Sequence, residues 1–453
     1  MSELSFRDAW SFLDHLQLFK IKLGLDSMRA FLDPLGHPQK KFPSMHIGGT
    51  NGKGSVAATL LSVLTESGYK VGSYTSPHLS SVRERFKIGD RYIPEHDFAS
   101  AAEKIIQILN GRQITYFEFT TTLAMLWFAQ ENVDLAILEV GLGGRLDATN
   151  VVDPMVSVIT NISMDHEQHL GDTITAVASE KAGIIKPGIP VVTGETEEEP
   201  LSVIQATAKK QGSRLYLPGR DFRGSLDPAE KSLWTYEGIV FPPSAKQTSL
   251  ANLPLSMKGD YQVDNASIAL AALEIIAPQF PVEEEHIRSG LKKVTWPGRL
   301  EEFWRDEQGK ILRNNDVHDA SLTHFLLDGA HNPAGADALK KSLRHDFKYD
   351  RLVLVWASMA DKDMNRTLIA IAPLADEIIL TQPEAERSAA PEILFRLLPD
   401  NLQNKTVCVR DVKDALQLAV KKSRPASMIC VAGSLYLVGR VRQILCGELV
   451  QKQ

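Results

Sequence analysis

Apolar residues near the start of the chain recur every three or four positions, the spacing of one face of an α-helix. Phe6, Trp10, Leu13 and Leu16 form this stripe, and Ser5 stands directly before it. Serine is favoured at helix N-termini because its side-chain oxygen accepts a hydrogen bond from the backbone of the first turn. The pattern therefore predicts an amphipathic helix that packs on a core, with Ser5 as its N-cap.

The next part of the chain alternates short apolar runs with helical patterns. A run that ends at Gly48 leads through a glycine-rich turn into a helix expected from about Gly54 to Ser67, and YKVGSYTS predicts a second strand. The same alternation predicts the strands DLAILEVG, MVSVIT and IPVVTG, with helices at about 120–131 and 173–184. Apolar strands separated by helices are typical of a mostly parallel sheet that helices cover on both faces.

The region 213–258 has a different pattern. It is rich in turn residues and contains short alternating stretches, such as GSLDPAEKSLWTYEGIVFPP. We expect small antiparallel strands here, appended to the first sheet. The preceding acidic run ETEEEP, residues 195–200, is expected to be a solvated loop.

A second alternating pattern follows a proline–glycine pair. After a helix predicted around DNASIALAALEIIA, Pro297 and Gly298 indicate a boundary. Beyond it we expect strands in THFLLDGAHNP, DRLVLVWASM, DEIILTQ, TVCVRD and SMICVAGSLYLVGRV, with helices between them. The patterns predict two α/β domains, residues 1–297 and 298–453.

Composition and charge narrow the class of protein. The 453 residues are 43% hydrophobic and 23% charged, which is ordinary for a soluble globular protein. A net charge of −6 without any Lys/Arg-rich run argues against a nucleic-acid partner. Cys408, Cys430 and Cys446 lack CxxC spacing, and the N-terminus does not resemble a signal peptide, so a cytoplasmic protein is expected. No stretch approaches the roughly 18 apolar residues of a membrane span, so no membrane partner is expected.

The stretch HIGGTNGKGSVAATLL, residues 46–61, joins the first of these strands to its helix. A helix N-terminus turns several backbone N–H groups outward, and the helix dipole favours an anion there. Glycines allow close approach of a phosphate, and Lys53 supplies a charge for the β and γ phosphates. In the common phosphate loop a Ser or Thr follows the Lys directly, whereas here Gly54 precedes Ser55. The stretch favours a phosphate site, with a glycine-rich turn and an exposed lysine as the alternative.

Polar residues follow two of the other predicted strands. Glu139 ends the strand in ILEVGLGGRLDATN, and Asp165, His166, Glu167 and His169 cluster just past MVSVIT. Ligands gather at the carboxyl edge of parallel sheets, and Mg²⁺ prefers carboxylate oxygens. Glu139 is therefore a candidate Mg²⁺ ligand, and a histidine of the cluster is a candidate metal or phosphate contact. The alternative for Glu139 is a carboxylate at a strand edge that faces water, and the alternative for the cluster is a set of polar residues on an ordinary protein surface. GLGGRL lacks the spacing of a dinucleotide fingerprint.

Two further segments carry reactive side chains. Lys181 in SEKAGIIKPG lies on a predicted helix, where a lysine usually extends its amine to solvent. LLDGAHNP ends a strand of the second domain, with Asp328, His331 and Asn332 at the edge where a catalytic loop would lie.

Taken together and in this order, these segments resemble one family, the folylpolyglutamate and dihydrofolate synthases of the Mur ligase superfamily. The resemblance rests on GTNGKGS, YTSPHL, EVGLGGRLDATN, DHEQHLG, EKAGIIKPG, WPGRLE, LDGAHNP and GSLYL. It extends from residue 46 to residue 437, and the displaced Ser55 is the family's own variant of the loop. It implies an α/β protein whose P-loop ATPase domain, with a mostly parallel sheet, precedes a smaller Rossmann-like domain that binds glutamate.

The resemblance also implies roles for individual residues. ATP would lie on the phosphate loop, with further contacts from the second half of the chain: Gly52, Lys53, Gly54, Ser55, Asn265, Arg299 and Asp328. Ser76 and Glu139 would hold one Mg²⁺ and His166 a second. Lys181 matches a lysine that becomes carbamylated, a change that converts a cation into an anion able to lie beside Mg²⁺.

The remaining implied contacts are to the two substrates that are joined. The residues matching positions around the pterin-bearing acid are Thr115, Tyr116, Phe117, Glu118 and Asp147. His331 and Ser434 fall where the family places glutamate. Lys181, Asp328 and His331 are the residues expected to be catalytic.

The implied reaction is ATP-dependent amide formation between L-glutamate and dihydropteroate, a reduced folate, or both. The acid would be activated as an acyl phosphate by positioning and electrostatics, and a monomer is expected. Two alternatives stay open from the residues alone. One is a P-loop ATPase that acts as a switch, and the other is a Mur-type ligase of cell-wall peptides.

Overall fold

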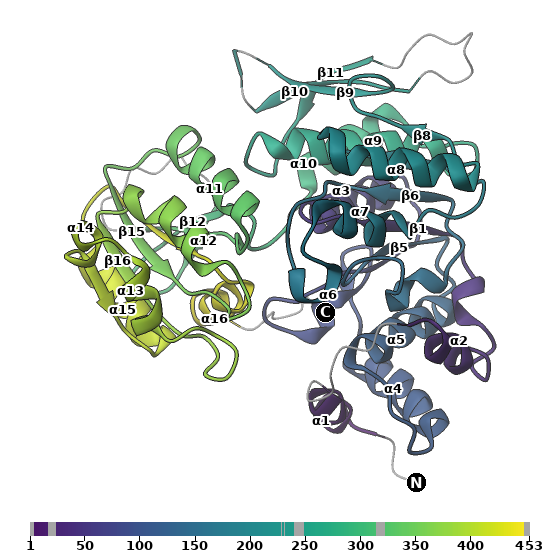
Figure 1. Cartoon of the computed structure of the whole chain (residues 1–453), viewed down its shortest axis with the longest axis horizontal. Coiled ribbons are helices and arrows are strands. Elements are labelled where there is room, and N and C mark those ends of the chain that lie inside the picture. Colours follow the sequence, from purple (N-terminus) through teal and green to yellow (C-terminus); the bar gives the residue numbers. More distant parts are fainter. Residues whose placement is uncertain are drawn as a thin grey trace. The chain divides into compact units, whose positions relative to one another are not determined.

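The chain divides into two compact units in a computed structural model that describes residues 4–16, 24–227, 229–230, 232–239, 249–313 and 322–447 (Figure 1). The first unit comprises Met1–Pro77, Val82–Ser256 and Gln262–Val294. The second comprises His78–Ser81, Met257–Tyr261 and Thr295–Gln453. The two short segments of the second unit were not predicted from the sequence. They are surrounded along the chain by residues of the first unit, and only tertiary packing assigns them.

An eight-stranded sheet, in the order β4-β3-β2-β5-β1-β6-β7-β8, forms the centre of the first unit. Neighbours from β2 to β8 pair in parallel, and β3 and β4 add an antiparallel edge. The strands are β1 (Ser44–Gly48), β2 (Val71–Tyr74), β3 (Phe86–Ile88), β4 (Arg91–Tyr92), β5 (Leu135–Glu139), β6 (Val156–Ile159), β7 (Val191–Thr193) and β8 (Leu215–Tyr216). Because β1 lies between β5 and β6, the strand order reverses there, and open α/β sheets bind ligands at such a point.

Helices cover both faces of this sheet, as predicted. In β5, Leu135 and Ile137 enter one core with α3, α9 and α10, while Ala136 and Leu138 enter another with α4 and α5 (Figure 1). Burying one such leucine stabilises the fold by about 1.5–3 kcal/mol. The helices are α1 (Phe6–Leu16), α2 (Asp26–Leu32), α3 (Lys53–Glu66), α4 (Glu95–Leu109), α5 (Tyr116–Gln130), α6 (Glu167–Leu170), α7 (Ile174–Ala182), α8 (Glu198–Gln211), α9 (Tyr261–Ile276) and α10 (Glu284–Lys293). Ser5 caps α1, accepting a hydrogen bond from the Asp8 amide at 3.2 Å.

The antiparallel strands after residue 213 form their own sheet, so the prediction that they are appended to the first sheet was wrong. The separate sheet has the order β11-β10-β9, made of β9 (Arg223–Leu226), β10 (Leu233–Glu237) and β11 (Ser249–Pro254), and only β8 joins the first sheet. Trp234 and Tyr236 alternate onto one face of β10 and are buried in the core that contains α9. The strands therefore pack on a helix instead of extending the edge at β8 (Figure 1).

The expected solvated loop at 195–200 was also wrong. Helix α8 begins at Glu198, and Glu195 is only 3% exposed. Glu197, Glu198 and Glu199 are exposed, as predicted for the run as a whole.

The second unit contains a seven-stranded sheet in the order β13-β12-β14-β18-β15-β16-β17, parallel from β14 to β17. Its strands are β12 (Glu301–Arg305), β13 (Ile311–Leu312), β14 (Thr323–Leu327), β15 (Arg351–Trp356), β16 (Glu377–Leu380), β17 (Thr406–Cys408) and β18 (Ser427–Ala432). Its helices are α11 (Pro333–His345), α12 (Met364–Ile371), α13 (Pro391–Leu397), α14 (Asp400–Gln403), α15 (Val412–Lys422) and α16 (Leu435–Cys446). β18 lies between β14 and β15, which gives this sheet a reversal of its own.

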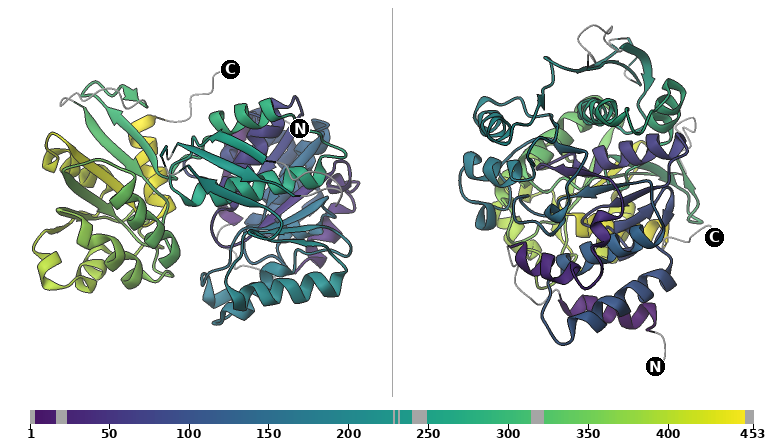
Figure 2. Two further views of the ribbon diagram at one scale, coloured as in Figure 1. Left: turned by 90° about the horizontal axis from the view of Figure 1, so that it is seen from above. Right: turned by 90° about the vertical axis from the view of Figure 1, so that its right-hand side faces the viewer.

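Two helical layers enclose this sheet as well (Figure 2). Leu352 and Leu354 of β15 pack in the core with α11, α12 and α13, and Val353 and Val355 pack in the core with α15 and α16. No helix among the described residues is long and apolar enough to cross a membrane.

Candidate functional site

The carboxyl edge of the first sheet brings together four of the predicted segments. The loop after β1 contains Gly52, Ser76 follows β2, Glu139 ends β5, and the loop after β6 carries Asp165 and His166. These strands run in parallel, so their carboxyl ends lie on the same side of the sheet.

The phosphate loop is shaped by a left-handed glycine and by α9. Gly52 has φ +86°, and a Cβ built there would lie 2.3 Å from Asn265 Oδ1. Any larger residue would therefore be strained and would displace the asparagine. Asn265 is oriented in turn, because its Nδ2 donates to Gln262 Oε1 at 2.9 Å. Gly54 and the buried Ser55 lie in the first turn of α3, which begins at Lys53.

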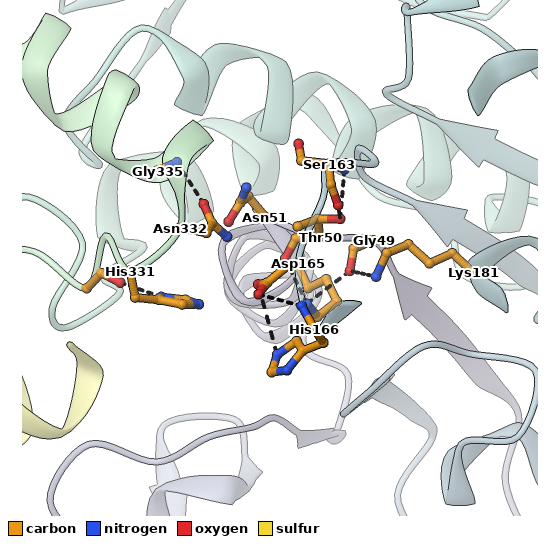
Figure 3. Close-up of polar contacts among 12 residues, drawn as sticks. Gly49, Thr50, Asn51, Ser163, Asp165, His166, Lys181, His331, Asn332 and Gly335 are labelled. Carbon is orange, nitrogen blue, oxygen red and sulfur yellow. Dashed lines mark hydrogen bonds and ion pairs between the residues drawn. The ribbon is translucent and has the colours of Figure 1, made fainter. Parts of the chain in front are cut away.

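Two lysine amines converge on one backbone carbonyl of this loop. Lys53 Nζ donates to Gly49 O at 3.1 Å and to Thr50 O at 3.0 Å. Lys181 Nζ donates to the same Gly49 O at 2.9 Å (Figure 3). Lys53 thus brings positive charge to the loop where a phosphate would add negative charge, and Lys181 places a second amine on the same carbonyl.

A lysine on such a helix usually extends its amine to solvent, but Lys181 does not. It lies in the last turn of α7 and is 5% exposed. A Cβ on Gly144 would lie 3.2 Å from Lys181 Cα, so the glycine turn after β5 packs closely on α7. Burial, with the nearby charge of Lys53, lowers the pKa of Lys181 to about 7. A substantial fraction of the amine is therefore neutral at physiological pH, the form that reacts with CO₂.

The loop after β6 holds the phosphate loop in place, a role that the sequence did not reveal. Thr50 N donates to Asn161 O at 2.7 Å, and Asn51 N donates to Asn161 Oδ1 at 2.9 Å. Thr50 Oγ1 donates to Ser163 O at 3.1 Å and accepts from Ser163 N at 2.9 Å (Figure 3). Thr160 Oγ1 donates to Asn51 O at 2.6 Å.

Two of the predicted metal ligands are adjacent. Glu139 is buried, and its Oε2 accepts a hydrogen bond from Ser76 N at 3.0 Å. Among the described residues no three His, Cys, Asp or Glu side chains cluster as a metal cage. Mg²⁺ usually takes only one or two carboxylates from protein and completes its shell with phosphate and water oxygens. The donor set of Glu139 with the Ser76 hydroxyl fits that kind of site.

His166, the third predicted metal ligand, lies more openly. Its backbone is left-handed, with φ 54°, and its exposed side chain has Nε2 3.9 Å from Asp165 Oδ2. It directly precedes the short helix α6, on which Glu167 and His169 are also exposed. The cluster therefore divides into Asp165, whose side chain is largely buried, and three exposed residues.

The segment TYFE begins α5, where two of its residues form a capping box. Thr115 Oγ1 accepts from Glu118 N at 3.1 Å, and Glu118 Oε2 accepts from Thr115 N at 2.9 Å. Ser27 Oγ donates to the other Glu118 oxygen at 2.5 Å. The spacing T-x-x-E is a recognised helix-start signature, so this structural use of Thr115 and Glu118 was available from the sequence. Tyr116 has the Arg85 guanidinium 5.2 Å from its ring centroid.

Phe117 and Asp147 meet at the glycine turn after β5. A Cβ on Gly141 would lie 2.4 Å from the Phe117 ring, and Asp147 Oδ2 accepts from Gly141 N at 3.1 Å and from Leu142 N at 3.0 Å. Asp147 Oδ1 accepts from the Thr149 hydroxyl at 2.5 Å. Burial raises the pKa of the Asp147 carboxyl, and these hydrogen bonds oppose the shift. Two of the residues predicted around the pterin-bearing acid, Phe117 and Asp147, thus contact the same turn.

The carboxyl edge of the second sheet gathers the other predicted residues. Asp328 follows β14 and is buried, with its oxygens accepting from Leu300 N and Ala330 N, each at 2.9 Å. Burial raises the pKa of Asp328, and the charge of Arg299 opposes this. A Cβ on Gly329 would lie 1.9 Å from Arg299 Nη1, so the guanidinium packs on the turn that follows Asp328.

His331 and Ser434 lie at the ends of β14 and β18, which are neighbours in the sheet. His331 Nδ1 lies 2.8 Å from Gly329 O. Ser434 caps α16, accepting from Tyr436 N at 3.2 Å. Asn332 caps α11 in the same way, accepting from Gly335 N at 2.8 Å (Figure 3).

Comparison with known proteins places this geometry in a family context. Residues 47–273 match the Mur ligase middle domain, and residues 313–435 match the glutamate ligase domain of Mur ligases. The chain is 32% identical to the dihydrofolate synthase/folylpolyglutamate synthase of Bacillus subtilis over 97% of this chain and 99% of that protein.

Two solved structures extend the comparison. Escherichia coli FolC in complex with DHPP and ADP aligns with a TM-score of 0.84 at 32% identity, covering 98% of each chain. A bifunctional folylpolyglutamate synthase/dihydrofolate synthase with Mn, AMPPNP and L-glutamate bound aligns with a TM-score of 0.82 at 30% identity, covering 97% of this chain and 98% of the other.

Proposed function

The chain belongs to the family of folylpolyglutamate and dihydrofolate synthases, ATP-dependent ligases with Mur ligase domains, and from this premise we propose that it joins L-glutamate to dihydropteroate, tetrahydrofolate or both through an acyl phosphate. The reaction class, ATP-dependent ligation of glutamate to a folate-type acid with a divalent metal, follows from the family. The choice of acid and the roles of individual residues are our proposal.

The observation that carries the proposal is the pair of lysine amines on the Gly49 carbonyl. A carboxylate is a poor acyl donor at neutral pH because its leaving group would be oxide. Phosphorylation supplies a better leaving group, and it needs charge stabilisation on the transferred phosphoryl group. Lys53 meets that need directly at the loop, with the backbone N–H groups at the start of α3.

Glu139 with the Ser76 hydroxyl would hold one Mg²⁺, and His166 would hold a second. The metal, when bound, neutralises charge on the phosphates and on the developing acyl phosphate. Lys181 would take part as a carbamate, because its buried amine is neutral enough near pH 7 to add CO₂ and become anionic. Thr115, Tyr116, Phe117, Glu118 and Asp147 would border the pteroyl acid, and the proximity of Phe117 and Asp147 at Gly141 supports this.

Glutamate would bind at the carboxyl edge of the second sheet, with His331 and Ser434 as contacts. Arg299 and Asp328 would contribute to nucleotide binding, and Asp328 would orient the turn that carries His331 through its bond to Ala330 N. The α-amine of glutamate would then attack the acyl carbon and release phosphate. No side-chain nucleophile takes part in this sequence. The monomeric state and the cytoplasmic location also remain proposals.

One assay tests the proposal. Purified protein with ATP, Mg²⁺ and glutamate receives dihydropteroate or tetrahydrofolate separately, and the products are separated by mass. We expect a product one glutamate heavier from at least one acid, with ADP release that requires both the acid and glutamate. Product from neither acid would overturn the assignment, and ATP turnover indifferent to both would favour a switch ATPase.

A further inference from the structure

One buried carboxylate outside the predicted site contacts the segment that holds the phosphate loop. Glu195 lies just beyond β7 and is 3% exposed. Its Oε2 accepts from Ile162 N at 2.6 Å, and its Oε1 accepts from Thr196 N at 2.9 Å and from Glu197 N at 2.8 Å. Burying an unpaired carboxylate is costly, and these three N–H donors offset that cost.

This contact matters because Ile162 lies between two residues that form hydrogen bonds to the phosphate loop. Ile162 stands between Asn161, which accepts hydrogen bonds from Thr50 N and Asn51 N, and Ser163, which exchanges two hydrogen bonds with the Thr50 hydroxyl. Fixing the amide of Ile162 therefore fixes the middle of the segment on which the phosphate loop rests. The chain of contacts runs from β7 through the loop after β6 to the loop after β1.

We propose that Glu195 is a positioning residue for nucleotide binding, holding residues 161–163 so that Thr50 and Asn51 keep the phosphate loop in its binding conformation. The inference rests on the proposed function only in taking this loop as the ATP site. A carboxylate is needed because both of its oxygens face N–H donors. A glutamine would direct its amide NH₂ toward at least one of those donors and leave it without an acceptor.

The test compares Glu195→Gln with Glu198→Gln, an exposed position of the same acidic run that loses the same charge. We expect Glu195→Gln to weaken ADP binding, measured by calorimetry, about tenfold, since one buried donor is left unsatisfied. The KM for ATP should rise by a similar factor, while the KM values for glutamate and the pteroyl acid change less than about twofold. The control should bind ADP like the wild type. Equal ADP affinity in the two variants would overturn the proposal.

A double-mutant cycle separates positioning from general loss of stability. Glu195 and Asn161 act on one segment, so the effects of Glu195→Gln and Asn161→Ala on ADP affinity should be clearly less than additive. Fully additive effects would overturn the proposal. If the glutamine variant does not fold, Glu195→Asp, which keeps the charge and shortens the reach, replaces it in both measurements.

Measuring ADP binding also distinguishes failure of the proposed function from failure of the role proposed for Glu195. A wild type that binds ADP but ligates glutamate to neither acid overturns the proposed function and leaves this test valid. An active wild type whose Glu195→Gln variant binds ADP normally overturns only the role of Glu195.

Discussion

Helices that begin at the carboxyl edges of the two sheets differ in whether a side chain caps their first turn. In the first unit α3 follows Gly52, which has no side chain with which to cap the helix. In the second unit α11 and α16 begin after Asn332 and Ser434, whose side chains accept hydrogen bonds from their own first turns. No side chain caps the start of α3, which leaves its N–H groups available to a ligand, whereas α11 and α16 are capped by side chains of the protein itself.

The charged groups beside these helix starts also differ. Lys53 donates to the Gly49 carbonyl just before α3, with the Lys181 amine on the same carbonyl, whereas the buried Asp328 lies beside Arg299 ahead of α11. A polyphosphate needs many donors and positive charge, while a small amino acid carries charges of both signs. Under the proposed function, the same α/β architecture would serve two kinds of ligand through what precedes each helix.

The largest expected effect comes from removing charge at the first edge. Lys53→Ala should lower kcat about a thousandfold, because the transferred phosphoryl group loses its nearest side-chain cation. Phosphate release under saturating substrates measures it. Lys104→Ala, at an exposed position of α4, is the control and should leave kcat unchanged. A Lys53→Ala variant with wild-type kcat would contradict the role proposed for positive charge at the first edge.

Removing the second lysine should have a smaller effect. Lys181→Ala should lower kcat about a hundredfold, and short carboxylic acids such as acetate should restore part of it if a carbamate is the active form. Lys209→Ala, an exposed lysine in the last turn of α8, is the matched control. An active Lys181→Ala variant excludes the residue from the mechanism.

Burial of the Lys181 amine should also make the free energy of unfolding depend on pH. The pKa of Lys181 is about 7 in the folded protein, below its ordinary value of 10.5, so the unfolded chain binds more protons between these pH values. The free energy of unfolding of the wild type should therefore rise with pH relative to Lys181→Met, by at most about 1.4 kcal/mol per pH unit. Urea unfolding at pH 7 and 9 in CO₂-free buffer measures this. A difference between the proteins that does not change with pH would contradict the burial of a neutral amine.

The smallest effect concerns the second edge. Ser434→Ala should raise the KM for glutamate several-fold without changing the KM for ATP, and should cost about 1 kcal/mol of stability through the lost cap. Asp411→Ala is the control, because Asp411 caps α15 in the same unit by accepting from Asp414 N. It should lose similar stability with an unchanged KM for glutamate. If Ser434→Ala and Asp411→Ala change the KM for glutamate equally, Ser434 acts only as a helix cap.

Much of the fold could be predicted from the sequence because apolar runs mark buried strands and the residues after them mark a sheet edge. Glu139 and Asp328 are examples, since each was placed at a strand end by pattern alone. Glu195 could not be placed in this way. Its burial depends on Ile162, which is distant in sequence, and its acidic neighbours are exposed. The burial of Lys181 could not be predicted from the helical pattern either, because its partner Gly49 belongs to another loop.

The separate sheet β9–β11 shows that the packing of a whole strand can also escape prediction from the sequence. Alternation in β10 predicts a strand, but whether Trp234 and Tyr236 pack on a helix or on the sheet edge depends on a helix that follows later in the chain. Thr115 and Glu118 illustrate the opposite case, because their capping box can be recognised from local spacing.

The central claim, that the acid is activated by phosphorylation before glutamate attacks, has a direct isotopic test. Dihydropteroate or tetrahydrofolate, whichever acid the protein uses, is labelled with ¹⁸O in the reacting carboxylate and converted with unlabelled ATP and glutamate. The phosphate is then analysed by mass. The proposed acyl phosphate predicts one ¹⁸O atom in each phosphate released. Phosphate without the label, formed together with the glutamyl product, would contradict it.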